Sequence, residues 1–278
     1  MIKEYRRNIK CETQHPHPVE SPDYLNPAGS IEDNHSNAYF IYELDSFFNG
    51  MPYRLMDIGC AGGQFIVDVH HKGYPWLGVG IEGGNILGMT EEFEERETGT
   101  GDIITKARGH ENWTRYKDEC LFHADVTKPF KIINTETKTD IKFDIITAYE
   151  FFEHPLPEEI PYIIENIKNH LALGGRVCGT INLSSGGHHR CARSVEWWDD
   201  IFRNHGFEVQ DYPFRTSPRT TLEYLTKLQT VYDDHEPQDV CLIDETVIPL
   251  RYFTKDAKPG VYPACFYLPN PNSPESIT

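Results

Sequence analysis

The sequence lacks the features of a disulfide-stapled, zinc-binding or membrane-spanning protein. Its seven cysteines are an odd number with no C-x-x-C pair, a pattern typical of reduced thiols in the cytosol. No apolar run approaches the roughly 18 residues of a membrane span. The stretch MIKEYRRNIK is charged and has no apolar segment, so we expect no secretory signal. These absences favour a cytoplasmic protein without a membrane span.

Positive charge is also scarce. Lysine and arginine total 26 against 43 acidic residues, a net charge of −17, and no basic stripe is visible. Proteins that track long nucleic acids need such a stripe, so the charge argues against a nucleic-acid partner. The chain has 278 residues, of which 38% are hydrophobic and 12% aromatic. That is enough to bury a core in one large domain, with or without an appended lobe.

Short apolar segments alternate with amphipathic ones along the chain. We expect strands over residues 53–59, 76–83, 143–152, 176–183 and 207–212, and another within 118–126. We expect helices over residues 37–48, 63–73, 157–175 and 194–207. Strands separated by helices predict βαβ units. The fold class expected is α/β, a doubly wound, Rossmann-like and mostly parallel sheet of seven strands with helices on both faces.

The chain divides into three regions. Residues 1–37 are an N-terminal arm, and its Pro-, His- and Asn-rich part, 11–36, is expected to be irregular. Such an arm is either a disordered leader or a lid over a site. Residues 38–215 form the core. Residues 216–278 are a C-terminal extension, with a helix expected at 220–232 and a late strand at 261–268 that would complete the sheet.

Small residues crowd the turn after the first expected strand. Asp57 is followed by Gly59, Cys60, Ala61, Gly62 and Gly63. Glycines let the backbone approach a ligand closely, and the helix that follows offers its free N–H groups. A tight turn without chemistry is the alternative. The dinucleotide fingerprint G-x-G-x-x-G fails because Ala61 and Gln64 occupy glycine positions, so a nicotinamide dehydrogenase is a poorer interpretation.

Acids stand near the ends of the next two strands. Glu82, followed by Gly83, lies about 20 residues beyond the glycine turn, where a carboxylate can accept hydrogen bonds from both ribose hydroxyls. Asp125 follows the third strand and can accept from an exocyclic amine such as adenine N6, while the backbone N–H of Val126 donates to a ring nitrogen. Solvated turn carboxylates are the alternative. Together with the glycine turn, these acids favour a nucleoside site.

The fourth strand runs into YEFFEHPLP, which places two carboxylates beside an imidazole. Pro155 disfavours helical geometry at His154, so we expect this group on a strand-to-loop turn. Glu150, Glu153 and His154 can bind a hard divalent cation such as Mg²⁺ or Mn²⁺ through oxygen and nitrogen ligands. Alternatively, Glu150 contacts a cofactor and His154 holds a loop.

Two histidines lie on a glycine-containing loop after the fifth strand. His188 and His189 would face whatever lies over the strand ends. A near-neutral pKa suits a histidine to general-base work. Either residue can instead complete a metal site with Glu150, Glu153 and His154, or be a solvated loop residue.

Taken in order, these motifs resemble the class I S-adenosylmethionine (SAM)-dependent methyltransferases over roughly residues 38–212. The matching segments are LMDIGCAGG for the first motif, GIEGG for the ribose acid, HADV for the adenine acid, DIITAYEFFEH for the fourth strand and IKNHLALGGRV before the fifth. Ala61 departs from the middle glycine of the first motif. The resemblance implies contacts of SAM with Asp57, Gly59, Cys60, Ala61 and Gly63 at the methionine end, Glu82 and Gly83 at the ribose, Asp125 and Val126 at the adenine, and Glu150 beside the sulfonium.

The activity that the resemblance implies is methyl transfer from SAM. We expect O-methylation of a small hydroxylated acceptor, such as a sugar or metabolite, with His189 or His188 as the base and Glu150 at the reacting end. The extension 216–278 would help shape the acceptor pocket. A looser similarity links the chain to methyltransferases of polysaccharide and secondary-metabolite pathways.

The pattern E-x-x-E-H is also similar to that of ubiquinone-type O-methyltransferases and of small-RNA 3′-terminal 2′-O-methyltransferases. In the RNA enzymes two glutamates and two histidines hold a divalent metal, and here Glu150, Glu153, His154 and His189 (or His188) would do so. Metal-dependent RNA methylation is therefore an alternative, against which the charge argues. A catalytically inactive cofactor-binding protein is a further alternative.

Overall fold

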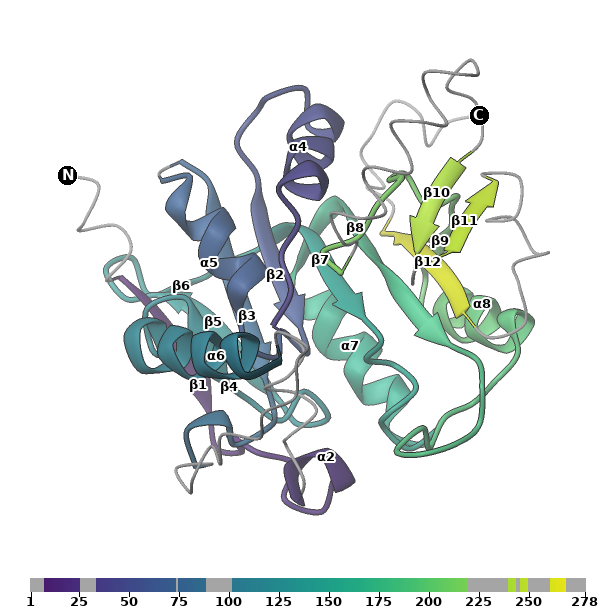
Figure 1. The fold of residues 1–278 in the computed structure, drawn as a ribbon, viewed down its shortest axis with the longest axis horizontal. Coiled ribbons are helices and arrows are strands. Elements are labelled where there is room, and N and C mark those ends of the chain that lie inside the picture. The colour runs from purple at the N-terminus through teal and green to yellow at the C-terminus, as the bar shows by residue number, and fades with distance from the viewer. Residues whose placement is uncertain are drawn as a thin grey trace.

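The computed structural model describes residues 8–25, 34–73, 75–88, 102–219, 240–243, 246–249 and 261–268. Its main element is a seven-stranded sheet of order β4-β3-β2-β7-β8-β12-β9 (Figure 1). These strands are β2 (Arg54–Ile58), β3 (Leu77–Glu82), β4 (Leu121–His123), β7 (Phe143–Tyr149), β8 (Leu171–Asn182), β9 (Glu208–Val209) and β12 (Val261–Tyr267). The first five in this order pair in parallel, and β12 runs antiparallel to β8 and β9. The predicted seven-stranded, mostly parallel sheet is confirmed.

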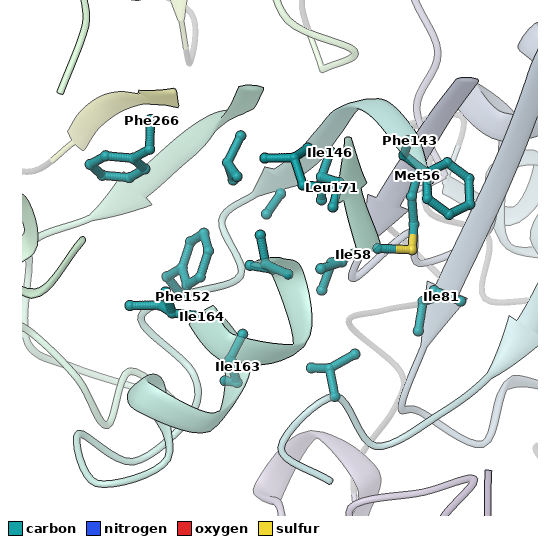
Figure 2. Packing of buried hydrophobic residues seen from close by; sticks show 14 of the residues in the cluster. Met56, Ile58, Ile81, Phe143, Ile146, Phe152, Ile163, Ile164, Leu171 and Phe266 are labelled. Carbon is teal, nitrogen blue, oxygen red and sulfur yellow. The ribbon is translucent and has the colours of Figure 1, made fainter. Parts of the chain in front are cut away.

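Helices cover both faces of this sheet. They are α4 (Ala38–Phe47), α5 (Gln64–His71), α6 (Asp102–Tyr116), α7 (Ile160–His170) and α8 (Val195–Asn204). The short helix α2 (Pro22–Leu25) lies in the arm, and a 3₁₀ turn spans Ile86–Gly88. Because successive side chains of a strand point to opposite faces, Met56 and Ile58 pack in the core under α7 and α8, whereas Leu55 packs in the core under α4, α5 and α6. Figure 2 shows Ile58 of β2 and Ile163 of α7 in the same buried hydrophobic cluster.

A second, three-stranded sheet flanks the first. It is built from β1 (Ile9–Thr13), β5 (Phe130–Asn134) and β6 (Thr139–Asp140), all antiparallel. A separate hairpin joins β10 (Val240–Ile243) and β11 (Thr246–Pro249). The expectation of an irregular arm over 11–36 is wrong for the end of β1 and for α2. The register that pairs Cys11 with Ile132 gives this segment hydrogen-bond partners far along the chain.

Several expected element bounds also change. The helix expected over 157–175 ends at His170, because Leu171 enters β8 opposite Phe143 and Gly174 donates its N–H to the Leu268 carbonyl at 2.9 Å. The strand expected over 143–152 stops at Tyr149, since Glu150 adopts a left-handed backbone with φ of 50°. Helix α6 and the small sheet have no counterpart among the expected elements, and the helix expected at 220–232 lies outside the described residues.

The late strand expected at 261–268 is β12, which lies between β8 and β9. Within the described ranges, no helix is both long and apolar enough to cross a membrane.

Candidate functional site

The carboxyl ends of β2, β3, β4 and β7 border one cavity of about 980 Å³. In doubly wound sheets ligands bind at this edge, where the strand order reverses. Here the reversal lies between β2 and β7, since the chain moves outward to β3 and β4 and then returns. The residues predicted from sequence that line the cavity are Gly59, Ala61, Glu82, Gly83, Asp125, Val126, Glu150, His154, His188 and His189. Asp57, Cys60, Gly63 and Glu153 lie behind this lining.

The turn after β2 holds an alanine in a conformation that favours glycine. Ala61 has φ of 49°, between Gly59 at 72° and Gly63 at 78°. Its N–H donates to Glu82 Oε2 at 2.9 Å, and its carbonyl accepts from Trp113 Nε1 at 2.7 Å. A strained backbone persists only where its surroundings over-determine it. Here the two hydrogen bonds, one to Glu82 of β3 and one from Trp113 of α6, hold Ala61 in this conformation.

The glycines of this turn also make room for protein neighbours. A Cβ on Gly59 would lie 2.9 Å from Cδ2 of Phe151, and one on Gly63 would lie 2.7 Å from Cδ1 of Leu121. Tight packing therefore explains part of the glycine content of this turn. This is what the alternative interpretation, a tight turn without chemistry, predicts. The cavity meets the turn at Gly59 and Ala61.

Asp57 and Cys60 support the turn from within the fold. Asp57 is only 7% exposed and accepts a hydrogen bond from Thr147 Oγ1 at 2.5 Å, which ties β2 to β7. Burial, with the charges of Glu82 and Asp57, raises the pKa of the Cys60 thiol well above its usual value. This thiol is therefore protonated and acts as a small apolar group.

Glu82 holds the turn after β2 and the loop after β3, which border the cavity. Besides the Ala61 bond, its Oε1 accepts from the Gly84 N–H at 2.7 Å. Burial raises the pKa of Glu82, and the hydrogen bonds from Gly84 and Ala61 work in the opposite direction. Each carboxylate oxygen has two lone pairs, so Glu82 retains acceptor capacity toward a ligand.

Asp125 and Val126, which the sequence resemblance assigns to the adenine, make bonds that the sequence did not indicate. Asp125 Oδ1 accepts from the N–H and the hydroxyl of Thr127 at 2.9 and 2.7 Å. The Asp125 N–H donates to the carbonyl of His15, in the arm, at 2.8 Å. The Val126 carbonyl accepts from Asn166 Nδ2 at 2.8 Å. Asp125 is thus fixed by its own turn and by the arm.

Two carboxylates after β7 are held by one asparagine. Asn182 donates its backbone N–H to Glu153 Oε1 at 3.2 Å and its Nδ2 to Glu150 Oε2 at 3.3 Å. The other oxygens, Glu150 Oε1 and Glu153 Oε2, are buried with no hydrogen-bond partner among the described residues. Burial, with the charge of Glu150, raises the pKa of Glu153 to about 9. Two uncompensated carboxylate oxygens call for a proton or a cation.

Glu153, His154 and His189 meet in one cluster. One ligand atom from each lies within 4.8 Å of the others. His154 Nδ1 bonds to Asp23 Oδ2 at 3.1 Å and His189 Nδ1 to the Ser184 carbonyl at 3.1 Å. Because a carboxylate and a carbonyl only accept, both Nδ1 atoms carry protons, and the neutral form of each ring has its lone pair on Nε2. The donor set fits a divalent cation. Glu150 is outside this three-residue group.

The arm supplies residues that the sequence did not single out. His17 Nδ1 bonds to the Gly83 carbonyl at 2.7 Å, and Pro18 packs where a Cβ on Gly83 would be. Asp23 bonds His188 Nδ1 at 2.8 Å as well as His154. Burial alone would raise the pKa of Asp23, but the hydrogen bonds and charges of His154 and His188 hold it below its ordinary value. The abundance of histidine and proline in the arm is the only feature of the sequence that pointed to a role of these residues in the site.

No protein-family model matches the chain, and no curated protein matches it. Three solved structures illustrate its structural similarities. An S-adenosylmethionine-dependent methyltransferase from Clostridium acetobutylicum is 11% identical, with 89% of this chain and 96% of that chain covered and a TM-score of 0.45. The 1,6-didemethyltoxoflavin-N1-methyltransferase of Burkholderia thailandensis is 11% identical, with 89% and 84% covered and a TM-score of 0.46.

The plantazolicin methyltransferase BamL, in complex with a triazolic desmethylPZN analog and SAH, is 14% identical, with 88% of this chain and 86% of that chain covered and a TM-score of 0.44. By its own strand order and layers, the chain has a doubly wound α/β fold with a cavity at the switch point of the sheet.

Proposed function

We propose that the chain is a class I SAM-dependent methyltransferase that methylates an oxygen of a small hydroxylated acceptor, such as a sugar or metabolite. One observation carries this proposal: Glu82, Asp125 and Glu150, which follow three different strands, line the same cavity beside the glycine turn. These are the acids that the resemblance assigns to the ribose, the adenine and the sulfonium. A cavity of about 980 Å³ is also within the usual range for small-molecule sites.

In this proposal the chain's own residues bind and orient the cofactor. Glu82 accepts from the ribose hydroxyls with the lone pairs that Ala61 and Gly84 leave free, and Asp125 accepts from the adenine amine. SAM supplies an activated methyl group on a positively charged sulfonium. Glu150, a residue that lines the cavity, favours that positive charge through Coulomb attraction.

The acceptor end of the cavity holds the proposed base and metal ligands. Glu153, His154 and His189, with Glu150 beside them, would hold a divalent cation such as Mn²⁺ or Mg²⁺. A bound cation lowers the pKa of a hydroxyl group. His188 has its Nδ1 on Asp23 and its side chain is 42% exposed, so its Nε2 can take the proton of the acceptor. Without a cation at the cluster, His189 is the alternative base.

Binding of S-adenosylhomocysteine by calorimetry tests the cofactor assignment. Glu82→Gln should weaken binding about ten-fold to a hundred-fold, since a hydrogen bond to a charged group contributes about 1.5–3 kcal/mol. Glu158→Gln, at an exposed position outside the cavity lining, should bind like the wild type. Unchanged affinity in folded Glu82→Gln and Asp57→Ala would refute the proposal.

The acceptor class needs a separate experiment. Methyl transfer from labelled SAM is measured to a panel of small hydroxylated compounds and to RNA oligonucleotides with free 3′ ends. Transfer to the small compounds is expected. Transfer to RNA alone, with binding that weakens steeply with salt, would replace the small acceptor by the RNA terminus.

A further inference from the structure

One carboxylate of the arm bridges two histidines of the candidate site. Asp23 Oδ2 lies 3.1 Å from His154 Nδ1, and Asp23 Oδ1 lies 2.8 Å from His188 Nδ1. The Asp23 and His154 side chains are only 30% and 28% exposed. The two histidines come from the turn after β7 and the loop after β8, so Asp23 joins three segments that are distant in sequence.

The bridge determines where each imidazole carries its proton. An ionised carboxylate can only accept hydrogen bonds. Both His154 and His188 must therefore be protonated at Nδ1, which leaves the lone pair of the neutral ring on Nε2. An unrestrained neutral imidazole carries its proton mainly on Nε2. The bridge thus imposes the less common tautomer, the one that a metal ligand or base acting through Nε2 requires.

Asp23 reaches this position through a segment that contacts the residues after β4 and β3 on its way. The His15 carbonyl accepts from the Asp125 N–H at 2.8 Å, and His17 Nδ1 bonds to the Gly83 carbonyl at 2.7 Å. Residues from His15 to Tyr24 line the cavity along this path. The bridge to the histidines therefore exists only while the arm lies across the nucleoside side.

We propose that Asp23 is a positioning residue: with the arm docked, its carboxylate fixes His154, a member of the Glu153/His154/His189 cluster, and His188, the proposed base, with their lone pairs on Nε2. The use of this cluster rests on the proposed function, but the tautomer assignment does not. Asp23 touches neither the cofactor nor the acceptor in this scheme. It acts through the two imidazoles.

Nitrogen-15 NMR of the imidazoles in the metal-free full chain tests the assignment directly, because the shifts of Nδ1 and Nε2 report which atom is protonated. In the wild type both His154 and His188 should be protonated at Nδ1. Asp23→Ala should move both toward the Nε2-protonated form. Asp23→Asn should move at least one, since its amide group donates to a ring nitrogen where the carboxylate accepted.

The chain offers two controls. Glu12→Gln removes an exposed acid of the arm that does not line the cavity and should leave both tautomers unchanged. His189, whose Nδ1 bonds to the Ser184 carbonyl, should keep its tautomer in every variant. Wild-type tautomers for His154 and His188 in both folded Asp23 variants would overturn the proposal.

Affinity for Mn²⁺ gives a second readout. Loss of a partner that orients a ligand histidine costs about 10-fold to 100-fold in metal affinity, so Asp23→Ala should bind Mn²⁺ that much more weakly while Glu12→Gln matches the wild type. Equal affinity in Asp23→Ala and the wild type would overturn the coupling to the cluster. S-adenosylhomocysteine affinity, measured on the same samples, tests the methyltransferase proposal independently.

Discussion

The carboxylate of Glu82, at the end of β3, accepts a hydrogen bond from the backbone N–H of Ala61, in the turn after β2, at 2.9 Å. The acid and the turn that the sequence suggested separately are therefore one structural unit. Trp113 of α6 holds the Ala61 carbonyl from the other side. The turn keeps its left-handed alanine because two neighbouring elements fix the peptide groups around it.

Ala61→Gly should stabilise the fold. A non-glycine residue in the left-handed region costs about 1–2 kcal/mol, which the extra chain entropy of an unfolded glycine partly offsets. The net gain expected in the free energy of unfolding is up to about 1 kcal/mol, measured by urea denaturation. Ala61→Val, which is β-branched, should lose stability. An Ala61→Val variant as stable as the wild type would contradict the strained assignment.

Gly59→Ala should destabilise more than Gly50→Ala. The two glycines have nearly equal φ, 72° and 70°, but a Cβ on Gly59 meets Phe151 at 2.9 Å while one on Gly50 meets nothing within 4 Å. Gly50→Ala should cost about 1 kcal/mol from the backbone alone, and Gly59→Ala about 1–3 kcal/mol more from overpacking. Equal losses in the free energy of unfolding, measured by urea denaturation, would show that the Phe151 side chain moves aside without cost.

His123 should make the fold less stable in acid. Burial, with the nearby charge of His17, lowers the pKa of His123 from 6.5 to about 4. The unfolded chain therefore binds more protons between these values, and the contribution of His123, present above pH 6.5, is lost as the pH falls toward 4. The full effect is on the order of 3 kcal/mol.

Replacing His123 by Gln isolates this contribution. The wild type and His123→Gln share all other titrating groups, so the difference between their unfolding free energies reports His123. His123→Gln loses the ring stacked on Trp113 at 4.3 Å and should be less stable at pH 7, but its deficit should shrink as the pH approaches 4. A constant difference over this range would exclude the shifted pKa.

Glu153→Gln should abolish the candidate metal site. The variant keeps the side-chain shape but replaces the carboxyl group, which can lose its proton to bind a cation and whose Oε2 lacks a partner among the described residues, by an amide that cannot become anionic. Affinity for Mn²⁺, followed by electron paramagnetic resonance of the free ion, should fall by more than about 100-fold, the upper limit for loss of an outer partner. Glu158→Gln, five residues along and exposed, should retain binding. Equal affinities would remove Glu153 from the site.

The strands and their ends could be predicted because local pattern determines them. Apolar runs bounded by glycine and acid placed β2, β3 and β7 close to their actual bounds, and parallel pairing then brought Glu82 and Asp125 to one edge. The expected turn at Glu153 and His154 followed from Pro155. These predictions needed only neighbours in sequence.

The remaining site could not be predicted because it depends on long-range pairing. Asp23 meets His154 and His188 only through the path of the arm, which the pairing of Cys11 with Ile132 sets. Likewise, Asn182, at the end of β8, bonds to one carboxylate oxygen of Glu150 and one of Glu153. The other oxygen of each residue is left without a partner among the described residues. No local pattern indicates which distant amide will reach a carboxylate.

The antiparallel strand β12 also sets an order of events during synthesis. It is the only neighbour of β9 in the described sheet and the outer neighbour of β8. Until residues 261–267 leave the ribosome, β8 has an unpaired edge, which is a template for pairing with another chain. Nascent chains that stall before this strand should therefore be the species that aggregates and that chaperones retain.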